Sequence, residues 1–344
     1  MKPDAVYDVM CMGRVGVDVY PVQIGVPLED VTTFGKFLGG SAANVAVATA
    51  RLGHSVGLIS KTGADPFGSF VNRELSRLKV DPRFVGVDQD QPTPVTFCEI
   101  FPPDRFPLYF YRGPTTPDLT LDVDEVPLEQ VQTARVFWVT LTGLSCEPSR
   151  RAHMAALQAR SAAAAGPVAP PAPGQAALET EPAMGQSWTV LDLDFRPSFW
   201  RGGEAEAKEQ ASRALQHCNV AVGNVEECRV ATGETEPAAA AAKLLDLGVQ
   251  LAVVKVGPDG ALAATRTRTW RVPGYRVKVV NGLGAGDGFG GALCHGLLSG
   301  WPMARVLQFA NAAGAYVTTH IDCSGAMPTQ AQVLDLIDRL ETSA

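Results

Sequence analysis

A series of apolar runs, separated by stretches with helical patterning, sets the fold class of this chain. The runs lie at residues 7–12, 55–60, 135–140, 188–194, 219–223 and 251–257. Strands that are apolar on both faces and alternate with helices are typical of a parallel sheet with helices on each side. The sequence therefore predicts a doubly wound, mostly parallel α/β fold.

Local signals predict where several helices begin and end. Between the first two runs, 41-SAANVAVATARLG-53 is a small-residue helix, for which Ser41 is a candidate N-cap and Gly53 a stop signal. A second helix is expected at 149–159, and a third at 289–298 after a strand at 276–280.

A β-rich region interrupts the α/β alternation. Residues 94–101 and 107–112 are two runs joined by 102-PPDRF-106, and their aromatics and alternation favour an antiparallel pair. Together with residues 16–37 they predict a small β-element beside the main sheet, such as a lid over a cleft. We place this β-lid at about 14–37 and about 93–118.

The stretch 161-SAAAAGPVAPPAPGQAALETEPAMGQ-186 is rich in Ala, Pro and Gly and nearly free of large apolar residues. Such a segment buries too little surface to offset the entropy lost on ordering. We therefore predict a mobile surface insertion before the strand at 188–194. A partner-binding Pro-rich segment is the alternative, although no P-x-x-P with basic flanks is present.

Charge and cysteine usage exclude several classes of protein. The formal net charge is −7, which argues against nucleic acid as a main partner, because phosphate backbones are bound by basic surfaces. No apolar run approaches the ~18 residues needed to span a membrane, and the N-terminus has no signal-peptide pattern. The seven cysteines are scattered and never form C-x-x-C. We expect reduced thiols in a cytoplasmic protein without a membrane partner.

The glycine-rich stretch 280-VNGLGAGDGFGG-291 contains G-x-G-x-x-G at Gly286, Gly288 and Gly291. A dinucleotide site would need an acid about 20 residues later to hold a ribose, and none occurs between Asp287 and Asp322. A carboxylate inside the loop would also repel a pyrophosphate. The dinucleotide interpretation is therefore disfavoured.

A phosphoryl-transfer site explains the same stretch better. Gly284, Ala285 and Gly286 lie where a helix begins, and the free N–H groups there form an anion hole. Asp287 can accept the proton of a substrate hydroxyl while that oxygen attacks a phosphate. An ordinary glycine-rich turn, with an acid near a helix N-terminus, is the structural alternative. The Walker motif G-x-x-x-x-G-K-[ST] is absent, which excludes a P-loop kinase.

With 39-GGSAANVA-46 near the N-terminus and 284-GAGD-287 near the C-terminus, the chain resembles the ribokinase-like (PfkB) carbohydrate kinases. Supporting motifs are 63-GADPFG-68, 224-NVEE-227, 255-KVGPDG-260 and 311-NAAGA-315. The resemblance covers nearly the whole chain. It implies a single domain over 1–344, Rossmann-like with a β-lid, that uses ATP and Mg²⁺.

Longer stretches resemble the members of this family that act on a sugar acid in myo-inositol catabolism. They are 13-GRVGVDVYPVQIGVPLEDV-31, 92-PTPVTFCEIFPPDRFPLYFYR-112, 191-LDLDFRPSFW-200 and 323-CSGAMPT-329. This resemblance implies phosphorylation of the 6-hydroxyl of 5-dehydro-2-deoxy-D-gluconate. Kinases for 2-keto-3-deoxygluconate, fructose or another sugar are the nearest alternatives. A sugar-binding regulator that lost catalysis is an alternative of another class.

The resemblance also implies roles for individual residues. Asp287 would be the catalytic base, with Gly284, Ala285 and Gly286 as the anion hole. Substrate hydroxyls would be held by Asp18, Gly39, Gly40 and Asn44. The nucleotide would contact Asn224, Lys255, Gly257, Gly260, Gly282, Gly284, Gly286 and Asn311. Glu227 would organise Mg²⁺ through water, because magnesium keeps several waters.

Arginine forks suit carboxylates and phosphates, and Arg14, Arg112 and Arg196 are the candidates for the carboxylate of the substrate or for the γ-phosphate. Many relatives carry an Asp where this chain has Asn281, and that Asp often helps to bind a monovalent cation. The sequence therefore leaves K⁺ activation open. Exposed lid strands could pair across a two-fold axis, which predicts a homodimer through the lid.

Overall fold

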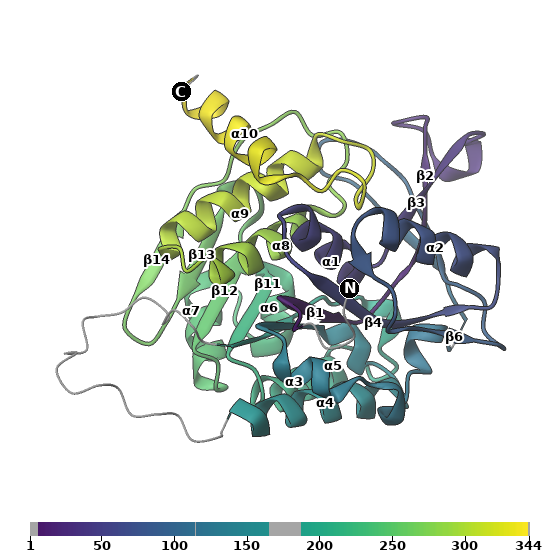
Figure 1. The fold of residues 1–344 in the computed structure, drawn as a ribbon. Helices are drawn as coiled ribbons and strands as arrows, with labels where there is room; N and C mark the ends of the chain where they lie inside the picture. The colour runs from purple at the N-terminus through teal and green to yellow at the C-terminus, as the bar shows by residue number, and fades with distance from the viewer. Residues whose placement is uncertain (1–5, 114, 165–186, 343–344) are drawn as a thin grey trace.

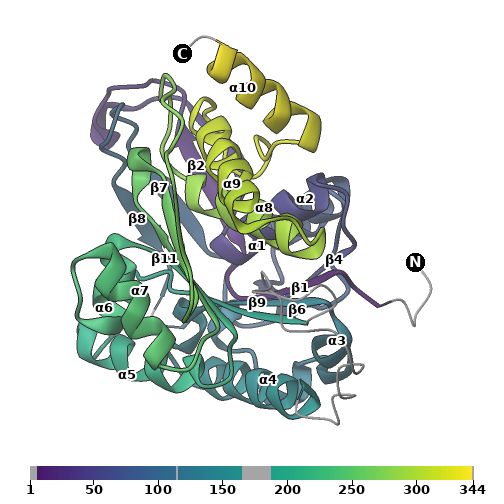
Figure 2. The same ribbon diagram turned by 90° about the vertical axis from the view of Figure 1, so that its left-hand side faces the viewer.

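A computed structural model describes residues 6–113, 115–164 and 187–342. Helices cover both faces of a large twisted sheet, with α1, α8, α9 and α10 on one face and α3 to α7 on the other (Figures 1 and 2). The predicted doubly wound α/β class is thus confirmed. Much of the predicted insertion, residues 165–186, lies outside the described residues; residues 161–164 continue the helix before it instead.

Within the described residues, the large sheet has ten strands in the order β14-β13-β12-β11-β10-β9-β1-β4-β5, with β6 also paired to β4. Its strands are β1 (Val9–Met12), β4 (Val56–Gly63), β5 (Val80–Asp81), β6 (Val85–Asp88), β9 (Val136–Thr140), β10 (Trp188–Asp192), β11 (Val220–Asn224), β12 (Leu251–Lys255), β13 (Ala261–Ala264) and β14 (Thr269–Val272). Along this order, the neighbouring strands from β12 across to β4 pair in parallel, whereas β13 and β14 extend the sheet as antiparallel strands.

The helices are α1 (Ser41–Arg51), α2 (Pro66–Arg77), α3 (Leu128–Thr133), α4 (Ser149–Ala164), α5 (Gly203–Leu215), α6 (Val225–Thr232), α7 (Pro237–Asp246), α8 (Ala285–Leu298), α9 (Met303–Thr318) and α10 (Gln330–Thr342). Alternation along the central strands divides the core between the two layers. Val9 and Cys11 of β1 face the α1–α8–α9 side, whereas Met10 and Met12 face the opposite side. Both faces are therefore buried, as the continuous apolar runs predict.

A second sheet of four strands follows the order β3-β2-β7-β8, formed by β2 (Gly16–Pro21), β3 (Phe34–Gly39), β7 (Val95–Cys98) and β8 (Leu108–Tyr111). The pair β7–β8 is antiparallel, as the sequence predicts. Strand β2 follows β1 after only three residues, so the small sheet starts at the carboxyl end of the large sheet. It thus stands beside the edge at which α/β proteins place their ligands.

Helix α8 packs closely on its neighbours because of its glycines. A Cβ on Gly290 would lie 2.7 Å from the Trp138 ring, and one on Gly288 would lie 2.9 Å from the Val317 side chain. A Cβ on Gly291 would overlap Ala48 of α1. Helix packing thus explains Gly288 and Gly291, two of the three glycines of the G-x-G-x-x-G spacing.

Three local predictions are wrong. Residues 276–280 form no strand, and instead run as irregular backbone toward the glycine loop. Helix α8 begins at Ala285, not at 289, because the glycines after Gly284 are already helical. Ser41 is the first helical residue of α1, and the N-cap is Gly40. The Ser41 hydroxyl bonds the Asp194 carboxylate instead.

Candidate active site

A cavity of about 820 Å³ opens at the carboxyl ends of β10, β11 and β12 and at the N-terminus of α8. It is lined by Arg196 and by all of the residues expected to bind the nucleotide, to organise Mg²⁺ and to carry out catalysis: Asn224, Glu227, Lys255, Gly257, Gly260, Gly282, Gly284, Ala285, Gly286, Asp287 and Asn311. These residues come from segments far apart in the sequence. The fold therefore brings the predicted nucleotide and catalytic residues to one place.

The N-terminus of α8 presents free backbone amides to this cavity. The first helical bond joins the N–H of Gly288 to the carbonyl of Gly284 at 2.9 Å, so the preceding amides have no intrahelical acceptor. Gly284 has φ +80°, which favours glycine, and a Cβ there would lie 2.9 Å from Cys323. A Cβ on Gly286 would lie 3.1 Å from the Lys255 Nζ. The glycines thus keep the loop close to a cation and leave room for an anion.

Asp287 stands in the first turn of α8 and is only partly exposed. Its Oδ2 accepts a hydrogen bond from Asn44 Nδ2 at 2.7 Å. Burial raises the pKa of Asp287 to about 6, an increase that the Asn44 bond opposes and the Asp194 charge reinforces. A carboxylate whose pKa lies close to neutral suits a general base.

Buried charges surround Asp287. Asp194 bonds Arg14 at 2.8 Å and Arg196 at 3.0 Å. Although burial opposes ionisation, these guanidiniums hold the pKa of Asp194 well below its usual range. Burial raises the pKa of Asp192 well above its usual range, against the attraction of Lys255. The pKa values of these two neighbouring aspartates are therefore displaced in opposite directions.

Lys255 ends β12 and lies 3.7 Å from the Glu227 carboxylate. Burial disfavours the charged ammonium, but Glu227 and Asp192 more than offset it, so the pKa of Lys255 is raised. Lys255 is therefore a permanent cation beside Gly286, which suits a phosphate.

Asn224 and Glu227 form a capping box at the start of α6. The Asn224 side chain accepts from the Glu227 N–H at 2.9 Å, and the Glu227 carboxylate accepts from the Asn224 N–H at 2.7 Å. Glu227 is thus buried and held in place, although it still lines the cavity. Among the described residues no cluster of three or more His, Cys, Asp or Glu side chains could hold a metal ion. An acid that acts on Mg²⁺ through water fits this arrangement, because magnesium binds substrate phosphates and keeps waters.

Asn311 of α9 lines the cavity, and its side-chain amide bonds the backbone at the end of β14. Its Nδ2 donates to the carbonyls of Val272 and Pro273, at 3.1 Å each. Gly260 has φ +100°, and a Cβ there would overlap the Val272 carbonyl. Gly257 has φ +60° with open space around it. These residues shape the wall expected to hold the base and ribose.

The predicted sugar-binding residues lie around the start of α1, and they do not line this cavity. A Cβ on Gly39 would overlap the Asp18 carboxylate, and one on Gly40 would lie 2.5 Å from the Arg14 carbonyl. Burial raises the pKa of Asp18 to about 6, while a 2.6 Å bond from the Tyr20 hydroxyl opposes the increase. Asn44 joins this group to the cavity through its bond to Asp287.

The three candidate arginines have different surroundings. Arg196 lines the cavity, and its Nε is buried without a hydrogen-bond partner. Arg14 is buried and bonds Asp194. Arg112 is bound to Asp118 at 3.0 Å. Arg14 and Arg112 lie 5.3 and 4.4 Å from the centroid of the Phe199 ring. Arg196 is therefore the one of the three placed to meet an anion in this cavity.

Sequence reasoning did not assign several residues of the site. Pro103 and Asp104, between β7 and β8, line the cavity, and Phe106 occupies the space beside Gly282. Ser324 lies 2.5 Å from the Asn44 side chain. Asp104 and Ser324 lie in stretches that carry the family resemblance, but no periodic pattern indicates which side chains of those stretches come together in the folded chain.

Asn281 is fully engaged with the backbone. Its Nδ2 donates to the Ile321 carbonyl at 2.8 Å, and its Oδ1 accepts from the Leu283 N–H at 3.1 Å. The side chain therefore ties the glycine loop to the segment after α9.

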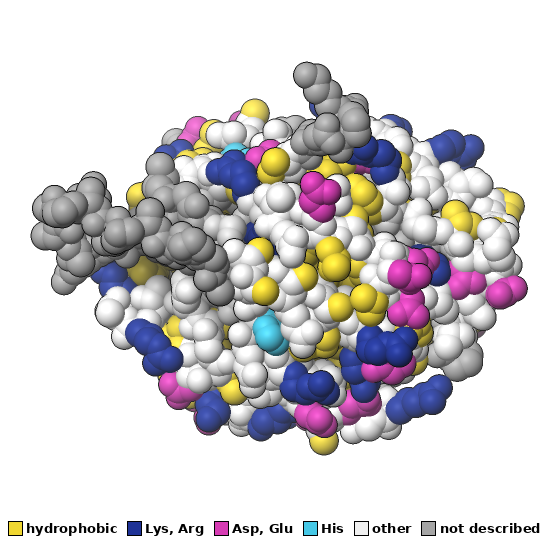
Figure 3. All heavy atoms as spheres, turned by 60° about the horizontal axis from the view of Figure 1, so that its bottom comes forward, with side chains coloured by type: hydrophobic (Ala, Val, Ile, Leu, Met, Phe, Trp, Pro, Cys, Tyr) yellow, Lys and Arg dark blue, Asp and Glu magenta, His cyan; other side chains and the backbone are white. Residues whose placement is uncertain are grey.

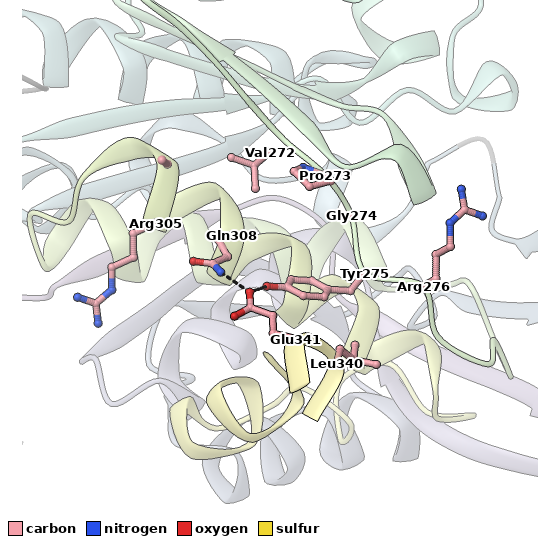
Figure 4. A pocket seen from close by; sticks show the side chains of 10 residues that line it. Val272, Pro273, Gly274, Tyr275, Arg276, Arg305, Gln308, Leu340 and Glu341 are labelled. Carbon is pink, nitrogen blue, oxygen red and sulfur yellow. Dashed lines mark hydrogen bonds between the residues drawn. The ribbon is translucent and has the colours of Figure 1, made fainter. Parts of the chain in front are cut away.

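A second cavity of about 600 Å³ lies behind residues 274–276, which also line the main cavity. Figure 4 shows Tyr275 and Gln308 directed at the Glu341 carboxylate of α10, with Arg276 and Arg305 pointing away from it. The Glu341 Oε1 accepts from the Tyr275 hydroxyl at 3.0 Å and from Gln308 Nε2 at 2.8 Å. These bonds fasten α10 against the wall of the main cavity.

The surface carries charges of both signs. On the face in Figure 3, Lys and Arg side chains alternate with Asp and Glu, without a continuous basic patch. In the part of the chain that the structure describes, none of the helices is long and apolar enough to cross a bilayer.

The chain belongs to the pfkB family of carbohydrate kinases, which matches residues 7–180 and 161–330. The protein is therefore a phosphotransferase with an alcohol group as acceptor. It is 30% identical over 339 residues to a protein of Clostridium perfringens named 5-dehydro-2-deoxygluconokinase, covering 97% of this chain and 93% of that relative.

Solved structures share this fold. A Vibrio cholerae fructokinase with bound fructose, ADP and calcium ion has a TM-score of 0.79 and 24% identity, over 97% of this chain and 99% of that one. An uncharacterized sugar kinase from Pyrococcus horikoshii in complex with ATP has a TM-score of 0.74 and 25% identity, over 95% and 97%.

Proposed function

We propose that the protein transfers the γ-phosphoryl group of ATP to the 6-hydroxyl of 5-dehydro-2-deoxy-D-gluconate, a sugar acid of myo-inositol catabolism. The observation that carries this proposal is the place of Asp287, at the open N-terminus of α8 and bonded to Asn44. The similarity to the Clostridium perfringens kinase, which spans almost the whole chain, supports this substrate.

Asp287 acts as the base in this proposal. Its carboxylate takes the proton of the 6-hydroxyl while that oxygen forms a bond to the γ-phosphorus and the bond to the β-phosphate oxygen breaks. The amides of Gly284, Ala285 and Gly286 stabilise charge on the transferring group. Bound Mg²⁺ would supply further neutralisation of the phosphates. ADP and the 6-phosphate are the products.

The remaining residues bind the two substrates. Lys255, Gly282, Gly284, Gly286 and Asn224 lie where the phosphates are expected, and Glu227 would meet Mg²⁺ through water. Gly257, Gly260 and Asn311 would hold the ribose and base.

The sugar would be held at the start of α1. Asp18, Gly39, Gly40 and Asn44 would contact its hydroxyls. All three candidate arginines bond a carboxylate. We assign the anionic contact in the cavity to Arg196, because of these three it is the one that lines the cavity.

We further propose that the four-stranded sheet is a lid and that two lids pair in a homodimer. Side chains on or near this sheet leave apolar surface exposed: Tyr111 at 67%, Val22 at 56%, Ile24 at 45% and Tyr109 at 41%.

We also propose a cytoplasmic location. The seven cysteines are unpaired, which suits the reducing cytoplasm.

An ADP-release assay across a panel of sugars and sugar acids tests the proposal. We expect the highest kcat/KM with 5-dehydro-2-deoxy-D-gluconate. Equal or better turnover of fructose, ribose or 2-keto-3-deoxygluconate would refute this substrate while leaving the kinase class intact. If no substrate supports ADP release although the sugar acid binds, the protein is a non-catalytic sugar-binding regulator.

A further inference from the structure

Asn44 is the only described side chain that bonds the Asp287 carboxylate directly. Its opposite end, the Oδ1, lies 2.5 Å from the Ser324 hydroxyl. The Ser324 Oγ also lies 2.7 Å from the carbonyl of Leu38. Ser324 is 1% exposed and Asn44 5%, so water does not compete for either. A buried chain thus runs from Leu38 through Ser324 and Asn44 to Asp287.

An asparagine side chain has two ends of nearly equal size, so packing alone does not decide which end faces the base. If the Asn44 Oδ1 faced Asp287, two acceptors would meet and the ionised base would be destabilised. While Asp287 is ionised, a hydroxyl that donates to Oδ1 from the other side opposes this reversal. The Ser324 hydroxyl stands in that place.

We propose that Ser324 is a positioning residue for the kinase reaction, and that its hydroxyl holds the Asn44 amide with the NH₂ end toward Asp287. The inference rests on the proposed function, in which Asp287 is the base. Ser324 itself is not among the residues that line the cavity.

The Leu38 carbonyl gives the chain a second state. When Asp287 has taken the substrate proton, its O–H can donate to the Oδ1 of a reversed Asn44. The NH₂ end then donates to Ser324, whose hydroxyl turns to Leu38. The single Ser324 hydrogen bonds the Asn44 Oδ1 while the base is ionised and the Leu38 carbonyl while the base is protonated, so the protonated base is tolerated until the proton leaves.

The acid side of the kcat profile reports on this network. Donation from Asn44 favours the ionised form and lowers the pKa of Asp287. Losing the fixed orientation should raise the apparent pKa by about 1, since a charge-assisted bond is involved. Starting from a pKa of about 6, the ratio of variant to wild-type kcat should then be about fivefold smaller at pH 6 than at pH 8. Comparison at equal pH cancels the titration of ATP.

Replacing Ser324 leaves the identities of the other charged and titratable groups near the base unchanged. The charged and titratable side chains that face Asp287 come from β10 and the segment after it, from β12 and from the 321–325 loop: Asp192, Asp194, Arg196, Lys255 and Cys323.

The experiment measures kcat from pH 5 to 9 for the wild type, Ser324→Ala and Ser324→Thr, with 5-dehydro-2-deoxy-D-gluconate and ATP. Ser149→Ala is the matched control, because Ser149 is also buried and bonds a backbone carbonyl, that of Gly143 at 2.8 Å. We expect the acid-side pKa of kcat to rise in Ser324→Ala but not in Ser149→Ala, and we expect the wild-type profile in Ser324→Thr. The KM for ATP of Ser324→Ala should stay within about twofold of the wild type.

A wild-type profile in Ser324→Ala, or an equal displacement in Ser149→Ala, would overturn the inference while the kinase activity stands. Absence of activity in the wild type would instead overturn the proposed function. If Ser324→Ala does not fold, Ser324→Cys serves in its place: its weak S–H donor should give a smaller displacement in the same direction, and an unchanged profile would refute the inference.

Discussion

Replacement of Gly284 by alanine tests whether the shape of the glycine loop supports catalysis. Gly284 has φ +80°, a conformation that costs an alanine about 1–2 kcal/mol relative to glycine. Its new Cβ would also lie 2.9 Å from the Cβ and Sγ of Cys323, so one of the two must move. Overpacking of this kind costs about 1–3 kcal/mol. The free energy of unfolding should therefore fall by about 2–5 kcal/mol.

Gly203 provides the matched control. It has φ +64°, and a Cβ there meets nothing within 4 Å. Gly203→Ala should therefore lose only the conformational part, about 1–2 kcal/mol, with kcat unchanged. Gly284→Ala should in addition lower kcat by about a hundredfold, because it displaces the amides of Ala285 and Gly286 from the transferring phosphate.

Urea unfolding gives the stability change, and ADP release at saturating ATP and sugar acid gives kcat. The reasoning is refuted if Gly284→Ala retains kcat within about twofold of wild type, or if both variants lose the same kcat. Equal stability losses in the two variants would contradict the overlap with Cys323.

Two further predictions concern charge. Because the base must be ionised, kcat should fall as pH drops through the Asp287 pKa of about 6, reaching about a tenth of its plateau at pH 5; a flat profile down to pH 5 would contradict this assignment. Arg14→Leu should lower the free energy of unfolding by about 3–5 kcal/mol, since Asp194 stays buried with half of its ion pairing lost. Arg77→Ala, which breaks the exposed 2.7 Å pair with Glu74, should cost less than about 1 kcal/mol; equal losses by urea unfolding would refute the difference.

Much of the fold could be predicted because continuous apolar runs and helical patterns are local signals. The strands β1, β9, β10 and β12 fall within predicted runs, and β4 and β11 overlap theirs but end beyond them. The predicted strand 276–280 is not formed because its alternating valines, Val277 and Val279, line the main cavity rather than pair in a sheet. The antiparallel strands β13 and β14 extend the sheet past the predicted edge, and pairing of that kind depends on contacts that no local pattern encodes.

The candidate site could be predicted in part for the same reason. The motif around Asp287 is contiguous, so its chemistry is visible in sequence. The partners of the arginines are not visible in the sequence, because Arg14 and Asp194, which bond each other, lie 180 positions apart. Ser324 and Asn44 are separated by 280 positions. Only the folded chain shows that all three arginines bond carboxylates and that, of the three, Arg196 lines the cavity.

Asp287→Asn tests the central claim most directly, because it removes the base and its charge while keeping the side-chain shape. The measurement is kcat for ADP release with 5-dehydro-2-deoxy-D-gluconate at pH 8, with ATP binding and the melting temperature measured alongside. We predict a loss of at least roughly a thousandfold in kcat, with the variant folded and still binding ATP. A kcat within about tenfold of the wild type would contradict Asp287 as the base of this kinase.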